Sequence, residues 1–456
     1  MMAMVATAAD RVGAAADEAA ALTREQALAA IDERLDGLRA QPPRAGLPVE
    51  PPPGWEELTA VPAGEGGPQE GDRRRPPLQV VALPVGDKVM PYTVLRKPGP
   101  GSDQTDEADQ VGHALFICMH GGGANPGAEG PHQWAVNTRE FLTQIELAGR
   151  AYEPGGVYLV PRMADDRLGR WWHRHQQEAF DAIIDHAILH WGVSPDRVYL
   201  LGVSEGGYGA AILAPWMADR LAGANAMAAG VGLANPPANL RNLAFRSDVG
   251  ENDRMFDRAA MAVAFHEELE RLRAGENDPA AYRHEIGVQS GRGHGIDYRP
   301  GVSWMAGHER DPWPARVVWI DQTLDGARRE RFYWLSRPGV EADDGGDARI
   351  VATVDREAAT ITLEAHRLQG RNTDGNRTHG MDDVAASERT PLSGAVIELL
   401  LSDRLLDLDA ELTVVCNGEP VFAGRVQRSL EVIERELGRR PDPRQCPVAA
   451  LRVTVP

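Results

Sequence analysis

The chain has 456 residues, of which 43% are hydrophobic and 25% are charged, and its formal net charge is -19. These values are typical of a globular protein with about two or three domains. The negative charge opposes the approach of nucleic acid or of an anionic membrane surface, so we expect neither as a partner. Three scattered cysteines do not suggest a disulfide framework, and no segment resembles a secretory signal or a membrane span. We therefore expect a cytoplasmic protein.

The N-terminal part is predicted to be a helical arm followed by a linker. Apolar residues recur with helical period between about residues 10 and 40, and Thr23-Arg24-Glu25-Gln26 has the form of a capping box. We expect this helix to end near Arg39 and to dock on the rest of the protein. From Gln41 to Pro77 the chain is rich in proline and glycine, a composition that buries little apolar surface. Residues 1–77 therefore form the first predicted unit.

From Leu78 the pattern changes to buried strands that alternate with helices. The segment VVALPVGDKVMPYTVL predicts a hairpin around Gly86-Asp87, and ALFICM at 114–119 predicts a buried strand. Alternation of this kind indicates a mostly parallel sheet with helices on both faces, which we predict for residues 78–338. Further strands are expected at 156–160, 197–201, 224–228, 243–246 and 285–289, and helices at 174–190, 206–217 and 258–273.

From about Gly339 the helical pattern nearly vanishes and short alternating strands take over. Asn417-Gly418 lies between two such runs and is typical of a tight hairpin turn. One helix is expected near 429–437. We predict that residues 339–456 form a small all-β module appended to the α/β domain.

The most informative motif is Gly202-Val203-Ser204-Glu205-Gly206, which joins a buried strand to a helix. A sharp turn of this kind projects the serine hydroxyl, so Ser204 is a candidate nucleophile. Both glycines are needed, because the turn brings neighbouring backbone so close that a Cβ would clash. A chain with 48 glycines can contain this motif by chance. The assignment depends on whether the serine has catalytic partners.

A nucleophilic serine needs oxyanion donors at the same edge of the sheet. The segment His120-Gly121-Gly122-Gly123 follows a buried strand, and its glycines allow backbone N–H groups to face a developing oxyanion. We expect the amide of Gly122 or Gly123 to act together with the amide of Glu205.

The acid and the base should follow the serine, each after a later strand. Asp253 is the preferred acid, because the preceding Gly-Glu-Asn supplies a turn that aims it, and Asp248 is the alternative. His294 lies between glycines on a tight loop and is the preferred base. His284 precedes a strand and His308 falls in a predicted helix, so neither is preferred over His294 as the base.

The segment GRWWHRH at 169–175 joins a strand to a helix, where the loops of such sheets line the active-site crevice. We expect Trp171, Trp172 and His120 to contact the substrate. Packing in the core is the alternative for at least one of the tryptophans. The two histidines of this segment have an HxH spacing, but no third ligand is evident nearby, so we expect neither a metal nor another cofactor.

The ordered motifs between Leu78 and Leu335 resemble those of the α/β-hydrolase superfamily. Within it, VSPDRVYLLGVSEGGYGAA resembles the branch of polyhydroxyalkanoate depolymerases, feruloyl esterases and prolyl-oligopeptidase-like enzymes. The resemblance implies an α/β-hydrolase fold and a serine esterase that cleaves a small or oligomeric carboxylic ester. The alternatives are a serine peptidase of the prolyl-oligopeptidase-like type and a non-catalytic binding protein that uses the C-terminal β module. The sequence leaves a homo-oligomeric state open.

Overall fold

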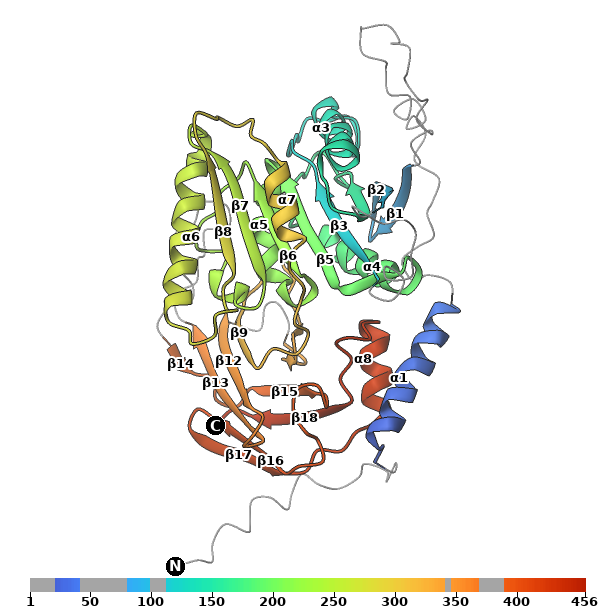
Figure 1. The fold of residues 1–456 in the computed structure, drawn as a ribbon, viewed down its shortest axis with the longest axis vertical. Helices are drawn as coiled ribbons and strands as arrows, with labels where there is room; N and C mark the ends of the chain where they lie inside the picture. The colour runs from blue at the N-terminus through green and yellow to red at the C-terminus, as the bar shows by residue number, and fades with distance from the viewer. Residues whose placement is uncertain (1–20, 42–79, 99–111, 341–345, 369–388) are drawn as a thin grey trace, which may run out of the picture.

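The computed structural model describes residues 21–41, 80–98, 112–340, 346–368 and 389–456 (Figure 1). The predicted linker up to Pro77 lies almost entirely outside these ranges. An eight-stranded sheet forms the centre, in the order β1-β2-β4-β3-β5-β6-β7-β8. β2 runs antiparallel to its two neighbours and the other pairs are parallel. The strands are β1 Val80–Val85, β2 Lys88–Lys97, β3 His113–Met119, β4 Gly156–Pro161, β5 Val193–Val203, β6 Gly223–Met227, β7 Ala244–Gly250 and β8 His284–Gln289.

Helices cover both faces of this sheet, which confirms the predicted α/β architecture (Figure 1). The central strands are continuous apolar runs because both of their faces are buried; in β3 every residue from Ala114 to Met119 is buried. One face packs against α4 Arg174–His190, α5 Glu205–Trp216 and α6 Arg258–Ala274, and the other against α3 Ala135–Glu146 and α7 Arg299–Met305. The predicted hairpin at Gly86-Asp87 is confirmed by the pairing of β1 with β2.

The C-terminal strands form two further sheets, with the orders β17-β16-β13-β12-β9 and β10-β11-β15-β18, and β14 pairs with β13. The Asn417-Gly418 turn and the helix near residue 430 are confirmed. The strands are β9 Arg316–Asp321, β10 Arg331–Phe332, β11 Leu335–Ser336, β12 Ala348–Asp355, β13 Thr360–Leu368, β14 Arg389–Pro391, β15 Val396–Leu401, β16 Leu412–Cys416, β17 Glu419–Gly424 and β18 Ala449–Thr454, and the helix is α8 Leu430–Arg439.

These sheets begin earlier in the chain than the boundary expected at residue 339. β9 pairs with β12, and β11 pairs with β15, although both β9 and β11 precede that boundary. Local periodicity identified a change of pattern near Gly339, but it could not show which strands pair across long sequence distances. The structure therefore places residues 316–336 in the sheets of the C-terminal module.

The N-terminal helix α1, Arg24–Arg39, has the predicted capping box, in which Thr23 and Gln26 bond reciprocally. Its buried face consists of Ala27, Ile31, Leu35 and Leu38, which recur at helical spacing. This helix lies beside α8 (Figure 1) and also contacts α4. It therefore docks on both the C-terminal module and the α/β domain.

Buried ion pairs join the module to the central sheet. Arg310 lies 2.8 Å from both Asp196 of β5 and Asp442 of the module. Arg440 lies 2.6 Å from Asp219, whose side chain is fully buried. Burial opposes ionisation of Asp219, but the charges of Arg440 and other arginines outweigh this effect and lower the pKa of the carboxyl. The contact between the module and the central sheet thus depends on buried arginine–aspartate pairs that cross it.

We predict that Arg310→Met destabilises the protein by about 3–5 kcal/mol, because it leaves the buried Asp196 and Asp442 without their shared partner. Thermal unfolding followed by circular dichroism would measure the loss. Arg404→Met, which removes an exposed arginine from the C-terminal module, serves as the control. Equal unfolding temperatures for the two variants would contradict a role for this ion pair.

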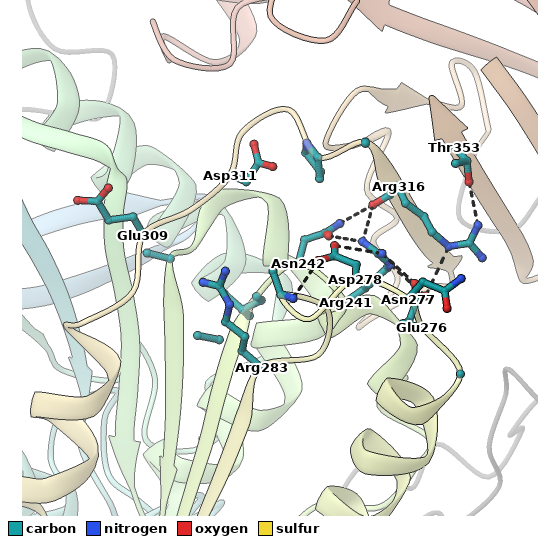
Figure 2. A pocket seen from close by; sticks show the side chains of 17 residues that line it. Arg241, Asn242, Glu276, Asn277, Asp278, Arg283, Glu309, Asp311, Arg316 and Thr353 are labelled. Atoms are coloured by element: carbon teal, nitrogen blue, oxygen red, sulfur yellow. Dashed lines mark hydrogen bonds and ion pairs between the residues drawn. The ribbon is translucent and has the colours of Figure 1, made fainter. Parts of the chain in front are cut away.

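A cavity of about 580 Å³ opens between the module and the α/β domain (Figure 2). Polar and apolar residues share its wall; among the polar ones, Arg241 donates to both carboxylate oxygens of Glu276, and Arg316 donates to Thr353. The residues from the α/β domain, such as Ala244 and Arg283, lie at or before the start of parallel strands. The cavity therefore lies at the amino-terminal edge of the sheet, opposite the edge that carries the candidate site.

A chain of polar contacts joins α6 to the sheet, from the buried Ser247 and His266 through His284 to the exposed Glu270. His266 contacts Ser247 through Nε2 at 2.9 Å and His284 through Nδ1 at 3.1 Å, and His284 contacts Glu270. Glu270 accepts from Nε2–H of His284, so Nδ1 of the neutral His284 ring carries no proton and accepts from Nδ1–H of His266. Nε2 of His266 therefore accepts from the hydroxyl of Ser247. Burial, with the charges of His284 and Arg246, lowers the pKa of His266 to about 3.

This depressed pKa predicts a loss of stability in acid. The unfolded chain binds a proton at this histidine below pH ~6.5, whereas the folded protein resists protonation until pH approaches 3. We expect His266 to lower the free energy of unfolding by about 1.4 kcal/mol for each unit by which the pH falls within that window. Urea unfolding from pH 7 to 4 should show a shallower decline for His266→Gln than for the wild type. Equal slopes would contradict the prediction.

Candidate active site

The turn between β5 and α5 has the strained geometry that the motif predicted. Ser204 has φ 55° and ψ -114°, in a region that residues with a side chain rarely occupy. A Cβ on Gly202 would lie 2.2 Å from the carbonyl oxygen of Gly206, and a Cβ on Gly206 would lie 2.2 Å from that of Met119. Both predicted clashes are thus confirmed. The turn leaves the Ser204 side chain partly accessible.

The structure brings the three candidate triad residues together. Nε2 of His294 lies 3.0 Å from Oγ of Ser204, and Nδ1 lies 2.7 Å from Oδ2 of Asp253. Asp253 is buried, whereas the His294 side chain is 46% exposed. With Nδ1–H donating to the carboxylate, Nε2 is left to accept the serine proton. This is the arrangement that activates a serine hydroxyl.

Contacts between two loops hold the base beside the acid. The amide of Asn252 donates to the carbonyl of Arg292 at 2.8 Å, and a Cβ on Gly250 would lie 2.0 Å from the carbonyl oxygen of Gly293. The carboxylate of Glu251 accepts from the hydroxyl of Ser290 and from the next amide. The segment before Asp253 therefore does more than aim the acid, because it also anchors the histidine loop.

The alternative acid and the two alternative bases make other contacts. Asp248 lies within β7, and both of its carboxylate oxygens accept from the guanidinium of Arg246. His284 belongs to the polar chain that joins α6 to the sheet. His308 follows α7 instead of lying within a helix, and its carbonyl accepts from Tyr199.

The oxyanion loop is held by Asn137 of α3, which sequence reasoning missed. The Asn137 side chain accepts from the amide of Gly123 at 3.0 Å and donates to the Gly123 carbonyl at 2.9 Å. Gly123 was an expected oxyanion donor, but its amide is already occupied, so this expectation is corrected. The Gly122 amide has no partner within the described part of the chain. The Glu205 amide lies in the first turn of α5, where no helical acceptor exists.

Two expected substrate contacts are also corrected. Trp171 and His120 are both completely buried, and the indole N–H of Trp171 donates to the His120 carbonyl. The His120 ring bonds to Gly121 and Met163, and burial lowers its pKa well below the ordinary value. These residues support the oxyanion loop from inside. Trp172 remains partly exposed, so it is still a candidate substrate contact.

An ion pair beside the nucleophile is the main feature that the motifs did not reveal. Arg170 donates to Oε2 of Glu205 at 2.8 Å, and its guanidinium lies 5.7 Å from the Trp172 ring centre. Glu205 is buried, and its Oε1 has no hydrogen-bond partner among the described residues. Burial raises the pKa of Glu205, and the charge of Arg170 opposes this rise. Arg170 has φ 62°, which adds strain next to the site.

The strand order places these groups at one edge of the sheet. The serine follows β5, the acid follows β7 and the histidine follows β8, as in the order of motifs that the resemblance implied. The chain has the α/β-hydrolase fold. This fold puts the catalytic groups on loops at the carboxyl ends of the parallel strands, which explains why residues 90 positions apart meet.

The chain matches no protein-family model and no curated protein. Among solved structures it is similar to a thermostable esterase, with a TM-score of 0.38 and 13% identity over 51% of this chain and 63% of that one. A ferulic acid esterase from Anaeromyces mucronatus gives 0.32 and 13%, over 52% and 91% of the two chains. A carboxylesterase from Mesorhizobium loti gives 0.30 and 18%, over 48% and 93%. The assignment of the fold rests on the strand order described above.

Two further features concern membranes and metals. No helix in the described ranges is both long and apolar enough to cross a membrane. Within the same ranges, histidine, cysteine and acidic side chains form no cluster of three or more that could hold a metal ion. His173 of the HxH pair contacts Asp325 instead, at 3.1 Å.

We predict that Arg170→Met destabilises the protein by about 1–3 kcal/mol, because the buried Glu205 carboxylate loses its partner. The partial exposure of Arg170 favours the lower end of this range. Glu205→Gln added to the same variant should recover stability, since a neutral amide needs no counter-charge. Thermal unfolding of the four proteins in this double-mutant cycle measures the coupling. Additive effects would show that the pair contributes nothing.

Proposed function

We propose that the protein is a serine hydrolase that cleaves carboxylic esters through an acyl-enzyme on Ser204. The observation that carries this proposal is the continuous chain of hydrogen bonds from Ser204 through His294 to the buried Asp253. The backbone strain at Ser204 supports it, because strain of this kind costs about 1–3 kcal/mol and persists mainly where function requires it. A protein that only bound ligands through its C-terminal module would gain nothing from this arrangement.

In the first step, His294 takes the proton of Ser204 as the hydroxyl attacks the ester carbonyl. Asp253 holds the imidazole in the tautomer with Nδ1–H and stabilises the imidazolium that forms. The amides of Gly122 and Glu205 are the groups that we assign to the oxyanion. His294 then protonates the departing alcohol.

In the second step, water enters and His294 removes its proton as it attacks the acyl-enzyme carbonyl. Collapse of the second tetrahedral intermediate releases the acid and returns the proton to Ser204. The partial exposure of His294 is compatible with entry of this water. All proton transfers thus pass through one imidazole, which needs no metal.

Short p-nitrophenyl esters and a fluorophosphonate probe test this proposal. We expect the wild type to hydrolyse the esters and to be labelled, and Ser204→Ala to lose labelling and at least about a thousandfold in kcat. Ser393→Ala, which alters an exposed serine of the C-terminal module, is the control and should leave both unchanged. Folded wild type that is neither labelled nor active would contradict the proposal.

An aminoacyl arylamide substrate separates the ester hydrolase from the peptidase alternative. Ester hydrolysis requires expulsion of a better leaving group than amide hydrolysis, so the same triad should favour esters. An ester hydrolase should cleave the p-nitrophenyl ester and leave the matched arylamide uncleaved, whereas a peptidase should cleave both. Turnover of the arylamide that Ser204→Ala abolishes would replace the ester assignment with the peptidase.

A further inference from the structure

We propose that Arg258 is a positioning residue of the triad. Its guanidinium binds both Asp253 and the helix that follows the nucleophile; we call these two hydrogen bonds the clamp, and each of them an arm. This inference rests on the proposed function. Arg258 is the first residue of α6, and its side chain is 8% exposed. Neither the motifs nor the order of strands assigns it any role.

The first arm of the clamp holds the acid. Nη1 of Arg258 donates to Oδ1 of Asp253 at 3.1 Å, while Oδ2 accepts from His294 at 2.7 Å. The two carboxylate oxygens are thus divided between two different donors. Without the guanidinium, Oδ1 would lose its side-chain donor in a buried position, and the carboxylate would be free to rotate away from the imidazole.

The second arm reaches the nucleophile's own helix. Nε of Arg258 donates to the hydroxyl of Tyr208 at 3.1 Å. Tyr208 lies on α5, and its amide donates to the carbonyl of Ser204 at 3.0 Å. One guanidinium therefore connects the acid loop after β7 with the first turn after the nucleophile, two elements that are otherwise distant in sequence.

The backbone before Arg258 is shaped to return its side chain onto the acid. Phe256 and Asp257 both have left-handed φ values, 54° and 52°, so the chain turns sharply between Asp253 and α6. The Phe256 ring lies 5.1 Å from the guanidinium carbon, and the Tyr208 ring lies 5.8 Å away. Two aromatic rings thus flank the guanidinium and favour one orientation for it.

The start of α6 is also fixed by packing. A Cβ on Gly230 would lie 2.2 Å from the Arg258 carbonyl oxygen, so the helix begins in direct contact with the loop after β6. The clamp is therefore anchored at its backbone as well as at both arms. Such an anchor restricts the acid to one position relative to the elbow.

Kinetic measurements on Arg258→Met, Arg258→Lys and Tyr208→Phe test the clamp. Loss of positioning should lower kcat of Arg258→Met on the order of 10- to 100-fold, with KM changed by less than about threefold. The lysine keeps the charge but cannot span both arms, so its kcat should be intermediate. Tyr208→Phe removes only one arm and should have the smallest effect. Arg254→Met, an exposed arginine of the same loop, is the matched control and should equal the wild type.

A spectroscopic measurement makes the test independent of turnover. The proton between Nδ1 of His294 and Asp253 should give a far-downfield proton NMR signal that His294→Gln removes. We expect Arg258→Met to shift or broaden this signal while circular dichroism shows a folded protein, and Arg254→Met to leave it unchanged.

The outcomes separate the two proposals. If Arg258→Met only lowers the unfolding temperature, and leaves kcat and the downfield signal at wild-type values, the residue is structural and the clamp is wrong. If the wild type shows neither turnover nor labelling, the proposed function fails, but the downfield signal still decides whether Arg258 positions Asp253.

Discussion

The close contact of three backbone segments at the start of α5 is the constraint on which the site depends. Gly206 touches the end of β3, and Gly202 touches Gly206, so α5 is pressed against the sheet at the residue after the nucleophile. Only glycine permits this approach, and the approach forces Ser204 into its left-handed conformation. The same contact places the loop after β3 beside the serine, where a Cβ on Gly121 would lie 3.4 Å from the Ser204 Cβ.

Polar contacts from distant residues hold the remaining loops around this point. Asn137 fixes the oxyanion loop, and the backbone contact between Gly250 and Gly293 fixes the histidine loop. Arg170 compensates the buried carboxylate of Glu205, and Arg258 does the same for Asp253. Asn137, Gly250 and Arg258 are buried, so water competes little for their contacts and these restrict the loops strongly, whereas the partly exposed Arg170 contributes less. The site is therefore a set of loops that share one rigid edge.

The C-terminal module meets the α/β domain at the opposite edge of the sheet. Its attachment uses buried arginine–aspartate pairs, and α1 contacts both parts. Removing one partner of a buried ion pair leaves the other charge uncompensated and destabilises the protein, so we expect this junction to tolerate few substitutions of its charged residues. The module braces the amino-terminal ends of the strands, while the triad occupies their carboxyl ends.

The sequence by itself determined the alternation of strands and helices and the elbow, because these features follow from local periodicity and from steric needs of glycine, and the resemblance to α/β hydrolases supplied the order of Ser204, Asp253 and His294. It also suggested Trp171 and His120 as substrate contacts and Gly123 as an oxyanion donor. Only the tertiary structure showed that the first two are buried and that Asn137 occupies the third. Which strands pair, which polar groups meet and which side chains reach solvent depend on contacts between residues far apart in the chain, and local pattern carries no information about those contacts.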